Sequence, residues 1–394
     1  MSNPRTRTLN VGVLTHAYPR HDGDVAGAFI ERLVLALAAR GHGVHVVAPA
    51  DVGRGGKELR HQVPVTRVRY APAHRETLAY RGTMVAAARS LAGVVWGASL
   101  VWRQARTVAR LRVEQGLDLV HAHWWVPGGV SAWLSGRPYV VTLHGMDVVL
   151  LERSTAARVA ARRVLRGAAA VTAVSSDLAD RAARMARVDR EGIVVQPMPI
   201  DAGRFTRTSR GGGGVVTVGR LTSRKRLDLL LEALAHLRAA GQTLPLTIVG
   251  DGAERPRLER CVTDLRLGGQ VRFLGETPPD RIPETISDAD VFAFPALGEG
   301  FGLAAAEALL LGVPVVAARD GGGVRDIVPE SGAGRLVAPD SREIARAIGE
   351  LVGDPDARRL AAAAGAALRQ RLEPAAVAER FEALYRLVAS GRNA

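Results

Sequence analysis

VFAFPALGEGFGLAAAEALLLGVPVVAAR, residues 291–319, consists of two strand-sized apolar runs joined by a longer run of Ala and Leu. The lengths predict two parallel strands with a crossover helix between them. Gly298, Gly300 and Gly302 let the chain turn tightly where the helix begins. Two acids interrupt the pattern. Glu299 lies among the glycines, and Glu307 lies in the Ala and Leu run, where a buried charge is costly.

The same alternation of strand and helix runs through the whole chain. In the second half we expect strands at 214–220, 246–252, 271–276, 291–296, 314–319 and 334–339, with helices at 228–241, 253–262 and 301–312. In the first half we expect strands at 10–16, 44–49, 65–70, 118–123, 138–145, 170–175 and 192–198, and a helix at 28–41. This alternation predicts an α/β fold of doubly wound, Rossmann-like parallel sheets with helices on both faces.

The series occurs twice, which indicates two domains. A chain of 394 residues exceeds what one hydrophobic core usually serves. Residues 197–214 are rich in Pro, Gly, Ser and Thr, as linkers are. We therefore expect a first domain over 1–203 and a second over 204–374, with a C-terminal helix at about 375–394 that packs back on the first domain.

The composition is that of a globular protein of the soluble class, with 47% apolar and 23% charged residues. Cys261 is the only cysteine, so neither an internal disulfide nor a thiolate metal cluster can form. No secretory signal is visible, and the longest uncharged run, 90–102, is shorter than the roughly 20 residues that span a bilayer. A cytoplasmic location is the resulting expectation.

The net charge of +14 is unevenly divided. Residues 1–200 hold 27 Lys and Arg against 14 Asp and Glu, and the remainder holds 26 against 25. Such a bias favours an anionic partner for the first half: a membrane surface, a phosphorylated acceptor or nucleic acid. The alternative is a general enrichment of Arg on solvated helices. Nucleic acid is not expected, because aromatic residues are only 4% of the chain and single-strand binders need stacking aromatics.

In open parallel sheets, ligands bind beyond the carboxyl ends of the strands, so the residues after each strand are candidates. Arg220 and Lys225 follow the strand at 214–220 and precede a helix. Cations at a helix start suit a diphosphate, although a solvated basic loop is the alternative. After the strand at 291–296, the amides of Phe301, Gly302 and Leu303 are expected to be unpaired and to suit an anion as well.

The two acids offer hydrogen-bond acceptors near that second helix start. Glu299 can accept from a sugar hydroxyl, and Glu307, about two turns further along, can accept two hydroxyls of a cis-diol such as ribose. The alternative for Glu307 is an exposed helix position. Its apolar neighbours leave little polar face for that alternative.

The order and spacing of these motifs resemble the retaining glycosyltransferases of family 4, the glycosyl transferases group 1, over residues 214–340. The matching motifs are Gly219-Arg220-Leu221 with Lys225, Val249–Gly252, Phe273–Gly275, Glu299–Gly302 with Glu307, Gly312–Val316 and Gly334–Val337. Any one motif is weak, but the ordered series is specific. The resemblance implies the GT-B fold, in which two Rossmann-like domains face a central cleft.

The resemblance also implies roles for individual residues. Arg220 and Lys225 would hold the donor diphosphate. Glu299 would touch the transferred sugar and Glu307 the ribose, so that the two acids straddle a nucleotide-sugar. No metal or other cofactor is expected. The donor-binding set implied is Gly27, Arg220, Lys225, Gly252, Phe301, Gly302, Leu303 and Glu307.

The first half resembles the family's acceptor domain more loosely. Gly27-Ala28-Phe29, at a helix start, is similar to the family's glycine loop beside the diphosphate. Residues 121–124 and 142–147 match its strand-end motifs. His144 would then lie at the donor–acceptor junction and join Glu299, Arg220 and Lys225 in the catalytic set.

Three departures from the family bear on donor and acceptor choice. Residues 198–201 are Met-Pro-Ile-Asp, where Asn-Gly-Val-Asp is frequent. Arg226 follows Lys225 in place of Gly, and Asp326 stands where Glu is usual. These changes leave the enzyme class unaffected.

We expect a retaining enzyme that moves a sugar from a UDP- or GDP-sugar to an acceptor hydroxyl in polysaccharide, glycolipid or other glycoconjugate biosynthesis. The alternatives are a phosphorylase or sugar-nucleotide epimerase of the same fold, and a non-catalytic sugar or nucleic-acid binder. A dinucleotide oxidoreductase would need G-x-G-x-x-G after the first strand, and residues 15–27 do not fit. His121 and His123 share one strand face, which leaves a zinc site as a minor alternative.

Residues 81–112 predict where the protein works. Trp96 and Trp102 lie in the apolar middle of this segment, and the basic residues around them are Arg89, Arg103, Arg106 and Arg110. This composition suits a helix pair at an anionic bilayer, although a helix that covers a sheet has similar apolar residues. We expect peripheral attachment to the inner face of the cell membrane, where a lipid-linked or phosphorylated acceptor would be met.

Overall fold

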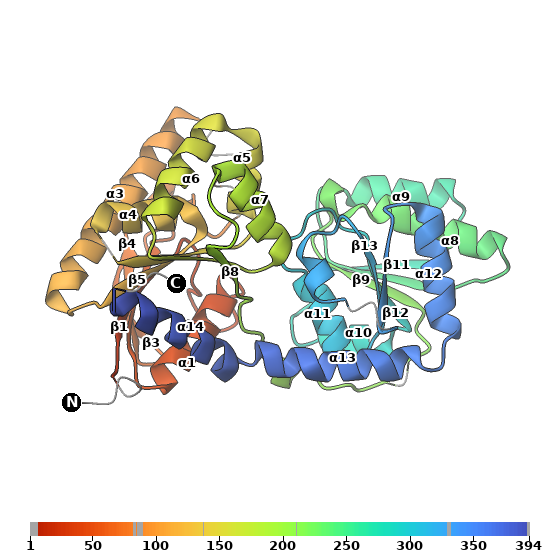
Figure 1. The fold of residues 1–394 in the computed structure, drawn as a ribbon. Helices are drawn as coiled ribbons and strands as arrows, with labels where there is room; N and C mark the ends of the chain where they lie inside the picture. The colour runs from red at the N-terminus through yellow and green to blue at the C-terminus, as the bar shows by residue number, and fades with distance from the viewer. Residues whose placement is uncertain are drawn as a thin grey trace. The chain divides into compact units, whose positions relative to one another are not determined.

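The computed structural model describes residues 7–81, 84, 90–136, 138–209, 211–328 and 332–391. The chain divides into two compact units, one of Met1–Ile200 with Pro374–Ala394 and one of Asp201–Glu373. Each unit contains one sheet with helices on both faces (Figure 1). The expected α/β class, with two doubly wound Rossmann-like folds, is confirmed.

The sheet of the first unit has the strand order β3-β4-β2-β1-β5-β6-β7-β8. All neighbours are parallel except β3 and β4, which are antiparallel. Most of its strands are buried apolar runs, as a parallel sheet covered on both faces requires. The strands are β1 Asn10–Leu14, β2 Gly43–Pro49, β3 Gly56–Arg60, β4 Val63–Val68, β5 Leu119–His123, β6 Tyr139–Leu143, β7 Ala170–Ala173 and β8 Ile193–Val195.

Two helical layers cover this first sheet. Helices α1 and α14 pack on each other on one face, and α3 and α4 pack on each other on the other face (Figure 1). The helices are α1 Ala28–Ala39, α3 Leu91–Glu114, α4 Val130–Ser135, α5 Met146–Arg153, α6 Thr155–Gly167, α7 Ser176–Ala186 and α14 Pro374–Ala389. The chain thus returns at its C-terminus to complete the first unit.

The sheet of the second unit is entirely parallel, in the order β11-β10-β9-β12-β13-β14. Its strands are β9 Val215–Val218, β10 Leu246–Val249, β11 Val271–Gly275, β12 Val291–Phe294, β13 Val315–Ala318 and β14 Gly334–Val337. Helices α8, α9 and α12 form one packed group, and α10, α11 and α13 form another. Their bounds are α8 Leu227–Ala239, α9 Arg255–Asp264, α10 Ile282–Asp288, α11 Leu303–Leu310, α12 Ser341–Gly353 and α13 Ala357–Leu372.

Among the described residues of the segment expected to form a helix pair at a membrane, the long helix α3 begins after the N-cap Ser90. Arg89 lies outside the described residues. Trp96 is half-buried, whereas the side chain of Trp102 is 53% exposed and stacks under the Arg106 guanidinium at 4.8 Å. Within the part of the chain that the structure describes, no helix is both long and apolar enough to cross a bilayer.

Candidate active site

The strand order of the second sheet places its expected ligand site at the carboxyl ends of β9 and β12. These neighbouring strands lead to opposite halves of the sheet, so their carboxyl ends flank the point where the order reverses. Open parallel sheets bind ligands at such points. The loop after β9 carries Arg220 and Lys225, and the loop after β12 carries Glu299. Residues far apart in sequence therefore meet at one edge.

Lys225 and Glu299 form an ion pair at this edge. The Lys225 Nζ lies 3.1 Å from the Glu299 Oε1, and both side chains are partly buried. The Lys225 ammonium also lies 5.1 Å from the centre of the Phe294 ring. The two residues that the sequence predicted to bind a diphosphate and a sugar are thus in direct contact.

Two arginines of the loop after β9, Arg220 and Arg224, differ in their hydrogen-bond partners. Arg220 is exposed, and its guanidinium has no ion-pair or hydrogen-bond partner among the described residues. Arg224 donates hydrogen bonds of 2.9 Å to the carbonyls of Leu297 and Gly298. Arg224 therefore ties the loop after β9 to the loop after β12, and Arg220 remains available for a ligand.

Arg226 explains one departure from the family pattern. It lies immediately before α8 with φ 46° and ψ 42°, the left-handed region where Gly is favoured. Its guanidinium holds the Asp320 carboxylate with two contacts, at 2.5 and 3.0 Å. Arg therefore stands here in place of the usual Gly, and its ion pair with Asp320 ties the loop after β9 to the loop after β13.

The start of α11 presents free backbone donors. Gly302, the N-cap, has φ 91° and ψ 46°, and its carbonyl accepts from the amides of Ala305 and Ala306. Among the described residues, no acceptor bonds to the amides of Phe301, Gly302 or Leu303. These are the three amides that the sequence predicted to be unpaired. They suit an anion, since a helix start also carries partial positive charge.

The two acids are held differently. The backbone of Glu299 is fixed on both sides, because its amide donates to Gly321 and its carbonyl accepts from Gly323, each at 2.9 Å. Glu307 lies half-buried in α11 among buried Ala and Leu residues. The structure thus places one acid before the helix start and the other within the helix.

Two of the predicted donor-binding glycines are required by close backbone approach. A Cβ on Gly252 would lie 2.3 Å from the Leu221 carbonyl oxygen, so only Gly lets the loop after β10 pack against the loop after β9. In the first unit, Gly27 caps α1 with φ 77°, and a Cβ there would lie 2.1 Å from the Ala17 carbonyl oxygen. Both glycines shape a strand-end loop, and their contact with a donor remains a prediction.

A histidine cluster occupies the corresponding edge of the first sheet, where β1 and β5 are neighbours. His16 follows β1, His123 ends β5, and His144 follows β6. The His123 Nδ1 and His144 Nε2 are hydrogen-bonded at 3.0 Å. Trp124 joins the cluster, with ring centres 3.9 Å from His16 and 4.5 Å from His144.

Burial keeps these histidines neutral. It lowers the pKa of His16 to about 4. It lowers the pKa of His123 and His144 well below the ordinary value, and repulsion from neighbouring histidines acts in the same direction. The loop that carries His144 is fixed by the buried Asp147, whose carboxylate accepts from the amides of His144 and Gly145 at 3.2 and 2.9 Å.

His121 is committed to the interior rather than to a ligand. Its Nδ1 bonds to the Tyr385 hydroxyl of α14, and its Nε2 bonds to the Thr142 hydroxyl, each at 2.6 Å. Both ring nitrogens are therefore occupied. Across the described ranges, no group of three or more His, Cys, Asp or Glu side chains is arranged to hold a metal ion.

Sequence reasoning missed His16 as a member of this cluster. The signal was present, because His16 ends the strand-sized run 10–16 as His123 ends the run 118–123, and His144 stands next to the end of the run 138–145. It also missed Tyr385, whose contact with β5 depends on the docking of the C-terminal helix and leaves no local pattern.

Two family profiles together match most of the chain. The profile described as glycosyl transferases group 1 matches residues 210–368, and the profile described as glycosyl transferase 4-like domain matches residues 26–199. The two matches fall in the second and the first unit.

Curated relatives carry the same assignment. The 2-deoxystreptamine glucosyltransferase of Streptomyces kanamyceticus is 30% identical over 62% of this chain and 71% of its own length. The alpha-D-kanosaminyltransferase of the same organism is 28% identical over 91% of this chain and 98% of its own. The D-inositol 3-phosphate glycosyltransferase of Nocardia farcinica is 32% identical over 61% of this chain, and the match spans only 60% of that relative's length.

Solved structures establish the fold. The sucrose-phosphate synthase of Thermosynechococcus elongatus superposes with a TM-score of 0.78 over 97% of this chain and 100% of its own, at 23% identity. Anabaena HepE, solved in complex with UDP and glucose, gives 0.72 over 95% of this chain and 98% of its own, at 22% identity. The expected GT-B fold is confirmed.

Proposed function

The chain belongs to family 4 of the glycosyltransferases, the glycosyl transferases group 1, and from this membership we propose that it is a retaining enzyme that uses a nucleotide diphosphate sugar. The donor is a UDP- or GDP-sugar. The acceptor is a hydroxyl of a growing polysaccharide, a glycolipid or another glycoconjugate. No metal or other cofactor takes part in the proposed reaction.

One observation carries the proposal: the Lys225–Glu299 ion pair, with Arg220 unpaired nearby, at the edge where the strand order of the second sheet reverses. A donor diphosphate would compete with Glu299 for the Lys225 ammonium. Its arrival would release the Glu299 carboxylate to accept hydrogen bonds from the transferred sugar. The ion pair would thus hold the Lys225 ammonium and the Glu299 carboxylate in position until the donor diphosphate replaces Glu299 as the partner of Lys225.

The proposed chemistry makes the departing diphosphate the main charge to stabilise. The bond from the anomeric carbon to the diphosphate oxygen breaks, and the acceptor oxygen forms a new bond to that carbon. The diphosphate gains one negative charge and can take the hydroxyl proton. Arg220, Lys225 and the free amides of Phe301, Gly302 and Leu303 would stabilise this charge.

The remaining predicted residues fit the other parts of the substrates. Glu307 in α11 would bind the donor's ribose, and Gly27 would let the start of α1 approach the diphosphate. His144 would lie beside the acceptor hydroxyl. Its neutral ring can donate or accept a hydrogen bond there.

Incubation with a panel of donors tests the proposal and separates it from the same-fold alternatives. UDP- or GDP-sugars should raise the melting temperature and be hydrolysed slowly without an acceptor, and the product's anomeric proton coupling in NMR should match that of the donor. Donor consumption that requires inorganic phosphate would indicate a phosphorylase. Release of an epimeric nucleotide sugar would indicate an epimerase, and stabilisation without turnover would indicate a binder.

The location is part of the proposal: a cytoplasmic protein attached to the inner face of the membrane. Support comes from α3, where the exposed Trp102 lies beside Arg103 and Arg106. The surplus of basic residues in the first 200 residues adds long-range attraction to anionic lipid.

A further inference from the structure

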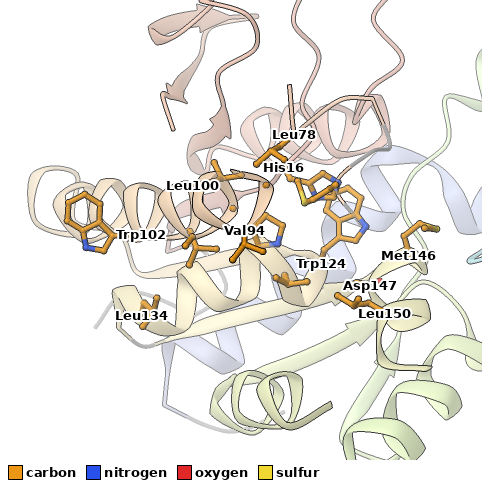
Figure 2. A pocket seen from close by; sticks show the side chains of 17 residues that line it. His16, Leu78, Val94, Leu100, Trp102, Trp124, Leu134, Met146, Asp147 and Leu150 are labelled. Carbon is orange, nitrogen blue, oxygen red and sulfur yellow. The ribbon is translucent and has the colours of Figure 1, made fainter. Parts of the chain in front are cut away.

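An apolar pocket of about 660 Å³ lies entirely within the first unit. Its volume falls in the range of small-molecule sites, and its surface is almost wholly hydrocarbon. Figure 2 shows Val94 and Leu100 of α3 between Trp102 on one side and His16 with Trp124 on the other. A pocket of this chemistry excludes a sugar ring as its main occupant, since sugar hydroxyls would lose their hydrogen bonds to water.

The pocket begins at the ligand edge of the first sheet. His16 follows β1, Trp124 follows β5, and Asp147 lies just after β6, and all three line it. The Trp124 ring also contacts the ring of His144, the residue proposed to face the acceptor hydroxyl, with centres 4.5 Å apart. The pocket is therefore continuous with the proposed acceptor site.

Among the described residues that line the pocket, one buried polar side-chain atom lacks a hydrogen-bond partner. The His16 Nδ1 is buried, and no described residue bonds to it. Its ring is neutral at pH 7 because burial lowers its pKa to about 4. An unpaired buried nitrogen is costly, which indicates a hydroxyl or water as its natural partner.

The lining of the pocket follows α3. Val94, Gly97, Ala98 and Val101 line it at intervals of three and one residues, which is one stripe of a helix. The stripe runs from Val94 to Val101, which is about 10 Å of helix. Gly97 leaves a gap in it, since a Cβ there would meet no atom within 4 Å.

We propose that this pocket holds the hydrocarbon chain of an amphipathic acceptor, with the hydroxyl that receives the sugar at the His16 end. The inference rests on the proposed function and narrows its acceptor to molecules with an alkyl or isoprenoid tail. The lining that follows α3 from Val94 to Val101 fits a chain, and the apolar lining excludes a polar tail. The unpaired His16 nitrogen lies where the chain would meet its polar head.

Alkyl glucosides of increasing chain length test the proposal on the full chain. Calorimetry with methyl, butyl, hexyl and octyl β-D-glucopyranoside, each below its micellar concentration, should show affinity rising about fourfold for each added methylene. The Gly97→Leu variant fills the gap in the stripe and should reduce octyl glucoside affinity to that of the methyl compound. Leu is a better helix former than Gly, so the variant should fold at least as stably.

A matched pair of α3 variants provides the second measurement. Val94 lines the pocket and Val113, on the same helix, is exposed outside it. Val94→Glu should weaken octyl glucoside binding at least tenfold, and Val113→Glu should leave it unchanged. Binding of free UDP or GDP is measured in the same samples and should be equal in all variants.

The outcomes separate this inference from the proposed function. Affinity that does not depend on chain length, or octyl glucoside binding that survives in Gly97→Leu, would overturn the pocket assignment while UDP or GDP binding persists. Octyl binding that survives in Gly97→Leu while Val94→Glu loses attachment to lipid vesicles would assign this face to the membrane instead. Loss of nucleotide binding by the unmodified chain would contradict the proposed function itself.

Discussion

At the scale of single residues, the two predicted phosphate-binding cations have different environments. Lys225 is partly buried and paired with Glu299, whereas Arg220 is exposed and unpaired among the described residues. A ligand must break one ion pair to reach Lys225 but none to reach Arg220. We therefore expect Arg220 to contribute more to the first capture of the diphosphate, and both to stabilise its departure.

Arg220→Ala and Lys225→Ala should each lower kcat about 100-fold or more, because each removes a donor from a group that gains charge in the transition state. Arg359→Ala, which removes an arginine that is 70% exposed on the same unit, is the control and should keep full activity. Steady-state kinetics at saturating donor measures the effect. If both active-site variants turn over at nearly the rate of the unmodified enzyme, the diphosphate does not bind to this loop.

Glu307→Gln should weaken binding of free UDP or GDP by at least tenfold, with a smaller effect on kcat. The substitution keeps the shape but removes the charge from a ribose contact, and a hydrogen bond to a charged group contributes about 1.5–3 kcal/mol. Isothermal calorimetry of nucleoside diphosphate binding measures it. Unchanged affinity would place the ribose elsewhere.

His144→Ala should cut sugar transfer while nucleoside diphosphate affinity remains, because the cations proposed to bind the diphosphate, Arg220 and Lys225, belong to the second unit and His144 belongs to the first. Transfer and calorimetric binding are measured side by side. If both are lost together, His144 supports the fold through its bond to His123 rather than the acceptor.

Sequence alone predicted which residues line the second sheet's edge but not which of them touch. Arg220, Lys225, Glu299 and Glu307 all stand out because each follows a strand or interrupts an apolar run. The contact between Lys225 and Glu299 depends on β9 and β12 being neighbours, and strand order is set by packing of the whole sheet. Local pattern carries no such information.

At the scale of elements, every strand expected from its apolar run is present. Among the described residues, the strand missed is β3, Gly56–Arg60, because its sequence GKELR is polar and it pairs only at the edge of the sheet. The strand is held by backbone bonds to β4 and by the Glu58–Arg67 ion pair. Edge strands of this kind lack the alternation on which prediction rests.

The histidine edge of the first sheet makes stability depend on pH. His16, His121, His123 and His144 all have their pKa lowered by burial. The folded chain keeps them neutral while the unfolded chain takes up protons below about pH 6.5. The free energy of unfolding should therefore be full above pH 6.5 and fall by about 1.4 kcal/mol per pH unit for each histidine as pH decreases.

Urea denaturation at pH 7.5, 6.0 and 5.0 measures this slope. His16→Gln should reduce the slope by the contribution of one proton. His16 is chosen because the rings of the other three histidines make hydrogen bonds to described residues, which a substitution would break as well. His61→Gln, at a ring that is 49% exposed, is the matched substitution. Stability that is level between pH 7.5 and 5.0 would show that these rings take up protons in the folded state.

At the scale of the whole molecule, the first unit is built from both ends of the chain. Helix α14 packs on α1 and β5 (Figure 1), and Glu382 of α14 accepts a 2.5 Å contact from Arg40. Tyr385 reaches the interior to bond His121. The second unit is a single continuous segment, Asp201–Glu373, inserted between the two parts of the first.

The uneven charge of the chain leads to a prediction about where the molecule works. The surplus lies in the first 200 residues, and α3 presents Arg103, Arg106 and Arg110 beside the exposed Trp102. Each basic residue near an anionic bilayer contributes about 1 kcal/mol of attraction. We expect the full chain to co-sediment with vesicles containing anionic lipid at low salt, and to be released at high salt because the attraction is screened.

Reversal of charge at defined positions locates the contact on the molecule. Replacing Arg103, Arg106 and Arg110 together by Glu should reduce binding to anionic vesicles at least tenfold. The control replaces three exposed arginines of the second unit by Glu, which changes the net charge equally: Arg272, Arg342 and Arg359. If both triple variants lose vesicle binding to the same extent, the attraction depends on net charge alone, and α3 is not the surface that contacts the membrane. If the unmodified chain stays in solution with anionic vesicles at low salt, the acceptor must be met away from the membrane.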